Sequence, residues 1–269
     1  MTTQTHAEIL RPGDGRPSSP LARILAMFEM EIRLTIRRPE NLFVTLVLPA
    51  VLLIFFGAMK ILPGTSTAAT TDQRPIDSVL PAILATAIVA AGLVNLGIST
   101  GFERSYGVLK RLGGSPLTRG QLLLAKIGAI VVVEIVQMVL LVGLGVLLFG
   151  WAPGAGWNSI AVALALILGT AAFSSLGLLF AGTLRAEGTM ALTNALFLLA
   201  LLLGGLLVPA AQLPGVLGTF ASVMPSAGLA DALRIGLGAA TGDLVEPLLL
   251  LVVWAVAIGL LTARTFRWE

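Results

Sequence analysis

Long apolar stretches alternate with short polar segments along most of this 269-residue chain. A helix needs about 20 apolar residues to cross the ~30 Å hydrocarbon core of a bilayer. The stretches of about this length are predicted to be spanning helices, and they cover residues 42–59, 79–100, 122–149, 160–181, 190–208 and 244–263. The pattern therefore predicts an all-α integral membrane protein, with six transmembrane helices in a domain of residues 40–269.

Residues 21–39, ahead of the first span, mix apolar and charged positions at helical spacing. Glu31 and the other charged residues lie off the apolar stripe, which consists of Leu21, Ile24, Leu25, Phe28, Ile32 and Ile36. This pattern is typical of an amphipathic helix lying in the membrane interface. Two compatible roles stay open: a simple membrane anchor, and an elbow that also contacts a cytoplasmic partner.

Composition also indicates a membrane protein, because 57% of the residues are hydrophobic and only 12% are charged, against about 25% charged in soluble domains. The chain has no cysteine, and its one histidine, His6, lies in a polar segment. Catalytic and metal sites built on those residues are therefore not expected. Residues 1–20 are rich in Pro, Gly and Ser, which predicts a disordered cytoplasmic tail without a signal peptide.

The cations are distributed unevenly between the two ends of the predicted spans. If both termini are cytoplasmic, only Lys60, Arg74 and Arg234 of the 17 Lys and Arg residues lie outside. The inner side then holds Arg11, Arg16, Arg23, Arg33, Arg37, Arg38, Arg104, Lys110, Arg111, Arg119, Lys126, Arg185, Arg264 and Arg267. The positive-inside rule thus predicts a multi-pass plasma membrane protein with cytoplasmic N- and C-termini. Membrane topology explains the net charge of +3, so no nucleic acid partner is expected.

Residues 102–121, between the second and third spans, form a patterned basic segment that we call the coupling loop. Apolar and basic residues alternate in it, and the run Gly113-Gly114-Ser115-Pro116 breaks it. Ser115 or Thr118 is expected to cap the helix that follows. A loop that only satisfied the positive-inside rule would need none of this patterning.

The coupling loop resembles a signature of the membrane subunits of type-2 ABC exporters, especially the small bacterial drug and lipid exporters. That signature reads E-R-x-x-G-x-L-[KR]-R-L-x-x-[ST]-P-[LV]-x-R-x-x-L-L-x-x-K. The matching residues are Glu103, Arg104, Gly107, Leu109, Lys110, Arg111, Leu112, Ser115, Pro116, Leu117, Arg119, Leu122 and Lys126. The resemblance extends over the whole chain, and residues 209–236 look like the family's re-entrant extracellular helices before the last span.

The resemblance implies the permease subunit of an ATP-driven exporter, which moves a drug, antibiotic, lipid or similar amphiphilic compound outward. The chain contains no G-x-x-x-x-G-K-[ST] phosphate-binding loop, so ATP and Mg²⁺ would be bound by a separate cytoplasmic ABC ATPase. A second copy, most simply in a C2 homodimer, or a related permease would complete the passage. By carry-over, the ATPase-coupling residues are Glu103, Arg104, Gly107, Leu109, Lys110, Arg111, Leu112, Ser115, Pro116 and Arg119.

Four polar residues inside the spans are further candidates: Glu134, Gln137, Asn95 and Asn194. A carboxylate costs at least a few kcal/mol in lipid, so Glu134 is expected to face protein or water. It would line the substrate route or act as a latch, or it would only make a structural hydrogen bond to a neighbour such as Asn95 or Asn194. The alternative function is an ion-gradient-driven secondary transporter, but the chain shows no clear inverted repeat and only one well-buried acid.

Overall fold

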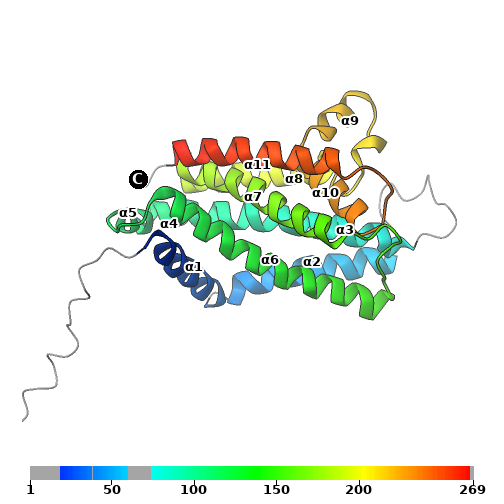
Figure 1. Ribbon diagram of the computed structural model, residues 1–269, viewed down its shortest axis with the longest axis horizontal. Helices are drawn as coiled ribbons and strands as arrows, with labels where there is room; N and C mark the ends of the chain where they lie inside the picture. Colours follow the sequence, from blue (N-terminus) through cyan, green and yellow to red (C-terminus); the bar gives the residue numbers. More distant parts are fainter. Residues whose placement is uncertain (1–18, 38, 60–73, 267–269) are drawn as a thin grey trace, which may run out of the picture.

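The computed structural model describes residues 19–37, 39–59 (side chains from 45) and 74–266, and these are helical with no strand (Figure 1). The first five elements are α1 (Pro20–Ile36), α2 (Pro39–Met59), α3 (Pro75–Val89), the π-helical η1 (Ala90–Leu96) and α4 (Gly97–Ser105). The next four are α5 (Val108–Gly113), α6 (Arg119–Phe149), α7 (Ser159–Thr183) and α8 (Ala186–Leu203). The last four are the 3-10 turn η2 (Ala210–Gln212), α9 (Gly215–Ser222), α10 (Pro225–Gly236) and α11 (Val245–Thr265).

Five of these helical segments are long and apolar enough to cross a membrane, namely the continuous helix Pro75–Ser105 (α3, η1 and α4), α6, α7, α8 and α11. The part of α2 with described side chains, Thr45–Met59, is apolar but shorter. Helices α9 and α10 meet at a bend of 79°, which makes them a broken span or a re-entrant pair. The predicted all-α membrane fold, with a bent segment before the last span, is confirmed.

Some boundaries differ from the predicted spans. The second spanning helix begins at Pro75, because Asp77 accepts a hydrogen bond from the Arg74 N–H (3.1 Å) and proline suits the first helical position. Helix α8 ends at Leu203 although the apolar run continues, because Gly205 has a φ of 79°. Of the predicted tail, residues 1–18 lie outside the described residues, and Ser19 caps α1 by accepting a hydrogen bond from the Ala22 N–H.

The helix Pro75–Ser105 is the buried axis of the bundle. Within its most apolar stretch 83% of residues are buried, compared with 22% for both α6 and α8 and 17% for α11. The axis packs closely on α7: a Cβ at Gly177 would lie 2.7 Å from the Leu93 carbonyl oxygen, and a Cβ at Gly97 would lie 3.0 Å from the Gly177 Cα. Small residues permit this close approach, as they do in other membrane helix pairs.

The two ends of the bundle are built differently, as Figure 1 shows. At the α5 end, α1 packs against α6 near α5, and an apolar cluster joins Met27, Leu109, Leu122, Leu178 and Phe266, the last of which follows α11. At the α9 end, the α9–α10 pair lies beside the connections between the longer helices. Both described ends of the chain are therefore at the α5 end.

Candidate functional site

The coupling loop turns sharply away from the buried axis at Gly107. This residue has a φ of 72° and precedes α5. A Cβ added there would meet no described atom within 4 Å, so glycine is needed for the backbone conformation rather than for space. Leu109 on the following helix is completely buried, and Leu112 packs against the same apolar cluster. The leucines of the short helix α5 therefore anchor it to the bundle.

The opposite side of α5 and the residues just before it are exposed. Tyr106 is 74% exposed and Val108 is 41% exposed, and both lie next to the exposed side chains of Lys110 and Arg111. Helix α5 lies at the tip of the bundle (Figure 1), so exposed apolar and cationic side chains occur close together in the chain at this tip. Exposed aromatic and arginine side chains in such a surface favour contact with another protein. We call Tyr106, Val108, Lys110 and Arg111 the α5 tip.

The far side of the coupling loop returns to the bundle through a capped helix start. Thr118 Oγ1 accepts a hydrogen bond from the Gln121 N–H (3.3 Å), and the Gln121 side chain accepts one from the Thr118 N–H (3.0 Å). This reciprocal capping box confirms that Thr118 caps α6. Ser115 instead closes the preceding turn, by donating to the Leu112 carbonyl oxygen at 2.6 Å. Arg119, in the first turn of α6, is exposed.

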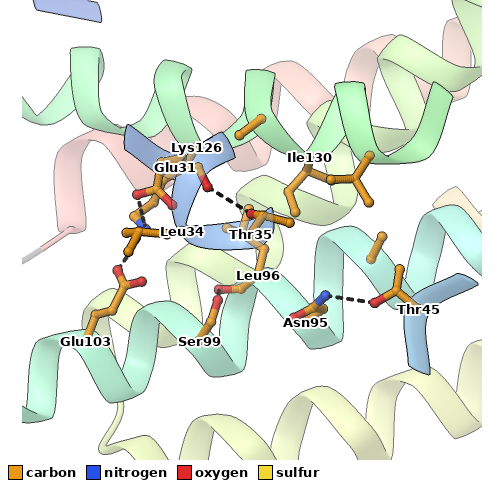
Figure 2. Close-up of a pocket in the computed structure, with 13 residues that line it drawn as sticks. Glu31, Leu34, Thr35, Thr45, Asn95, Leu96, Ser99, Glu103, Lys126 and Ile130 are labelled. Carbon is orange, nitrogen blue, oxygen red and sulfur yellow. Dashed lines mark hydrogen bonds and ion pairs between the residues drawn. The ribbon is translucent and has the colours of Figure 1, made fainter. Parts of the chain in front are cut away.

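Glu103 points inward, toward a lysine on the neighbouring helix. The ammonium nitrogen of Lys126 lies 2.8 Å from Glu103 Oε2 and 2.7 Å from Glu31 Oε1, and Lys126 is only 1% exposed (Figure 2). The three residues come from three elements: α4, α6 and α1. We call this arrangement the Lys126 node. It connects the start of the coupling loop to the first helix of the described chain.

Two arginines add further connections around the coupling loop. Arg104 donates a hydrogen bond to the Leu184 carbonyl oxygen at 2.6 Å, which ties the end of α4 to the link between α7 and α8. Arg23, in the first turns of α1, donates to the Pro116 carbonyl oxygen within the loop. The coupling loop is thus fixed to its surroundings on both sides, while the α5 tip faces outward.

The surface of helix α1 does not divide simply into one apolar face and one polar face. Met27 is buried and Glu31 is only partly exposed, so this side packs against the bundle. The apolar residues Leu21, Leu25 and Ile36 are exposed and leave an outward apolar row. The predicted stripe is therefore split: part of it packs on protein, and the rest is available to lipid. Glu31 belongs to the protein-facing side because Lys126 lies opposite it.

A small cavity of about 60 Å³, lined by both polar and apolar side chains, lies beside the Lys126 node (Figure 2). Its polar lining includes Glu31, Glu103, Lys126, Asn95 and Ser99. A cavity of this size and polarity has room for ordered water, which needs only about 10–15 Å³ of accessible volume per molecule and two or more polar partners. The node is therefore bordered by space in which its side chains can rearrange.

The polar residues predicted within the spans fall into two environments. Glu134 is buried against protein, as expected, but its partner is Thr170 of α7 rather than an asparagine, and its Oε1 has no partner among the described residues. Gln137 donates to the Thr45 carbonyl oxygen at 2.6 Å, and Asn95 donates to the Thr45 hydroxyl at 3.3 Å. Asn194 is exposed and donates only to its own helix, at the Met190 carbonyl oxygen.

Sequence reasoning gave no role to Glu31, Thr45 or Lys126. Lys126 did match the family signature. It also lies more than one turn inside an apolar helix, and this position indicates an ion pair, because a buried lysine requires an anionic partner. That partner could not be identified from spacing alone, since Glu31 and Glu103 are distant from each other in sequence. Thr45 gave no signal, because it acts partly through its backbone carbonyl.

The described residues thus form an all-helical membrane protein with a bent helix pair before the last span. Residues 22–237 match the model of the ABC-2 type transporter family, and the chain belongs to this family. It is 28% identical over 273 aligned residues to the protein named "Probable doxorubicin resistance ABC transporter permease protein DrrC" in two Mycobacterium tuberculosis strains, covering 98% of this chain and 95% of the relative. Permeases of this family lack the ATPase domain, so the protein is a multi-pass membrane subunit that requires an ATPase partner.

Proposed function

We propose that this chain is the permease subunit of an exporter, which moves a hydrophobic or amphiphilic compound outward across the plasma membrane. A separate ABC ATPase, which binds ATP and Mg²⁺, docks on the coupling loop and drives the movement. The observation that carries this proposal is the α5 tip, an exposed apolar and cationic surface on a base that is fixed by buried leucines. The doxorubicin resistance in the relative's name supports a drug-like cargo.

The position of α5 suits it for transmitting a push. Only Tyr106 and Gly107 separate it from α4, which continues through η1 and α3 as the buried axis of the bundle. A displacement of α5 therefore reaches the most buried helix directly. Glu103 and Arg104 face inward, so in this proposal they hold the loop in place, whereas the α5 tip makes the contact with the ATPase.

The charge distribution supports a cytoplasmic α5 end. Most described cations lie there, and Arg74 and Arg234 are the described exceptions near the α9 end. The positive-inside rule then favours a cytoplasmic location for the α5 end and for both ends of the described chain, which is also where ATP is available. The bent pair α9–α10 would lie on the extracellular side.

A complete passage would need two permease subunits, as a C2 homodimer or with a related permease. The outward apolar faces of α6, α8 and α11 are compatible with both lipid and subunit contact, because most of their residues are not covered within one chain. An apolar route between subunits would select cargo by shape and hydrophobicity. This selection fits an amphiphilic compound better than a polar one.

The test is co-purification of the chain with its cognate ABC ATPase in nanodiscs, followed by measurement of ATP hydrolysis. Replacing Val108 by Asp within the α5 tip is expected to abolish the complex, because it places an acid in an apolar contact. Trp157→Ala is the matched control, since Trp157 is also exposed but lies at the α9 end. ATP-dependent uptake of amphiphilic compounds, including doxorubicin, into inverted vesicles tests the direction.

Two outcomes would overturn the proposal. One is a stable complex that survives Val108→Asp unchanged, which would show that the ATPase docks elsewhere. The other is flux driven by an ion gradient in vesicles that contain this chain alone, which would favour a secondary transporter.

A further inference from the structure

We infer that Lys126 is a positioning residue that locks α1 to the coupling loop, so that the first helix moves together with α5 when the ATPase engages. This inference rests on the proposed function, because it specifies which parts of the chain the docked loop carries with it. It assigns a role in coupling to α1, and through it to Glu31, neither of which contributes to the α5 tip.

The geometry of the Lys126 node supports this role. One ammonium group holds two carboxylates from different helices, at 2.7 Å from Glu31 and 2.8 Å from Glu103. Lys126 is almost completely buried, so added salt screens these ion pairs much less than it would screen pairs at a surface. Without the lysine, two carboxylates that now share one ammonium group would lie close together without a cation, and their repulsion would weaken the connection between α1 and α4.

A second connection keeps α1 from pivoting about the node. Arg23 donates to the Pro116 carbonyl oxygen two turns before Glu31, and Met27 is buried between these positions in the cluster that contains Leu109 of α5. Helix α1 is therefore attached to the start of the loop and to its far side, and it shares an apolar cluster with α5. These attachments restrain both translation and rotation of α1 relative to the loop.

The consequence reaches the spans because α1 leads into α2. In α2, Thr45 accepts hydrogen bonds from Gln137 of α6 and Asn95 of η1. Thr45 and Asn95 also line the cavity beside the node. Movement of α1 with the coupling loop would thus act on a hydrogen-bonded contact at the start of the first span, next to a cavity that can take up water as the helices shift.

Two glutamates on α1 provide a matched test. Glu31→Gln breaks the α1 arm of the node and leaves the Glu103–Lys126 pair intact. Glu29→Gln, the control, changes an exposed glutamate that pairs only with Arg33 on the same helix among the contacts found. In the reconstituted complex, Glu31→Gln is expected to lower permease-dependent ATP hydrolysis by about tenfold, a typical size for the loss of coupling between two sites, because α1 loses its charged partner at the node. ATPase binding should be retained, because the α5 tip is unchanged.

A distance measurement provides a readout that reduced stability would not reproduce. The chain has no native cysteine, so spin labels at Ala26→Cys on α1 and Ser105→Cys at the end of α4 report one distance. This distance is expected to be the same with and without trapped ATP in the parent and in Glu29→Gln, and to change with ATP in Glu31→Gln.

Four results distinguish the possibilities. Equal ATP hydrolysis by Glu31→Gln and Glu29→Gln would overturn the inference, and so would a parent label distance that changes with ATP. Failure of the parent chain to bind the ATPase at all would instead overturn the proposed function. A Glu31→Gln protein that binds the ATPase normally but loses hydrolysis, with a variable label distance, supports the inference.

Discussion

Two buried cations, Lys126 at the α5 end and Arg234 at the α9 end, hold the molecule together in different ways. The ammonium group of Lys126 forms ion pairs with carboxylates from two other helices. Arg234, 8% exposed, contacts Asp231 on its own helix at 2.8 Å and the carbonyl oxygens of Gly205 and Leu206 at 2.9 and 2.8 Å. The lysine joins helices, whereas the arginine donates hydrogen bonds to backbone carbonyl groups just after the end of α8.

The difference follows from the chemistry of the two side chains. Arginine presents several donors in a fixed planar fork, which suits two adjacent carbonyl groups that have no helical partner after α8 ends. Such groups must be satisfied within the protein at membrane depth. Lysine is a compact charge on a flexible stem, so it can keep an ion pair while its partners shift. The contacts at the α9 end thus suit a fixed structure, and in the proposed mechanism the α5 end moves as a connected unit.

The largest effect is expected from Arg234→Met, which leaves two buried carbonyl oxygens without donors. The free energy of unfolding of this variant should be lower than that of the parent by about 3–5 kcal/mol, in the range for breaking a buried charged interaction. Thermal unfolding in detergent measures this change. Arg234→Lys should recover only part of the loss, because one ammonium replaces a fork of donors. A full recovery would contradict the role that we assign to the fork.

Lys126→Met should cost about 3 kcal/mol, because it leaves two facing acids. Here the cost should be recoverable: adding Glu31→Gln and Glu103→Gln removes the repulsion and should restore most of the unfolding free energy. The same triple variant should still show defective coupling, since the ion pairs that join α1 to the loop remain absent. A triple variant as unstable as the single one would show that packing, not charge, dominates the node.

Gly154→Ala tests the backbone contacts of the α9 end. A Cβ at Gly154 would lie 2.1 Å from the Gly238 carbonyl oxygen, so the backbone must shift, at a cost of about 1–3 kcal/mol. Gly156→Ala is the control, because its nearest contact would be an ordinary 3.9 Å. Thermal unfolding of the two variants should differ clearly, and similar values would argue against tight backbone packing at this end.

Gly107→Ala should have the smallest effect, about 1–2 kcal/mol, because the cost comes only from a left-handed φ and not from a clash. The same exchange of glycine for alanine thus has a conformational cause at the α5 end and a steric one at the α9 end. Hydrogen exchange should show faster opening confined to α5, together with weaker ATPase binding. Opening that spreads into α10 would contradict this separation of the two ends.

The sequence predicted the features that depend on local pattern. Span positions follow from apolar length, the bend at Met224-Pro225 lies within the predicted segment, and Thr118 was one of two expected caps for α6. The partners of Lys126 and Glu134 were not predictable, because they depend on which helices pack together. The split surface of α1 was missed for the same reason: a helical wheel separates apolar from polar residues but cannot distinguish lipid from protein.

The π-helical segment η1 determines the phase of the buried axis. A π-type turn accommodates about one extra residue, and one residue corresponds to about 100° of rotation in an α-helix. An uninterrupted α-helix from Pro75 would therefore point Glu103 away from Lys126 and Gly97 away from Gly177, where both now make close contacts. Side chains before η1 are oriented to match the core around α3, and side chains after η1 are oriented to match the coupling loop. The segment η1 provides the rotation between these two orientations.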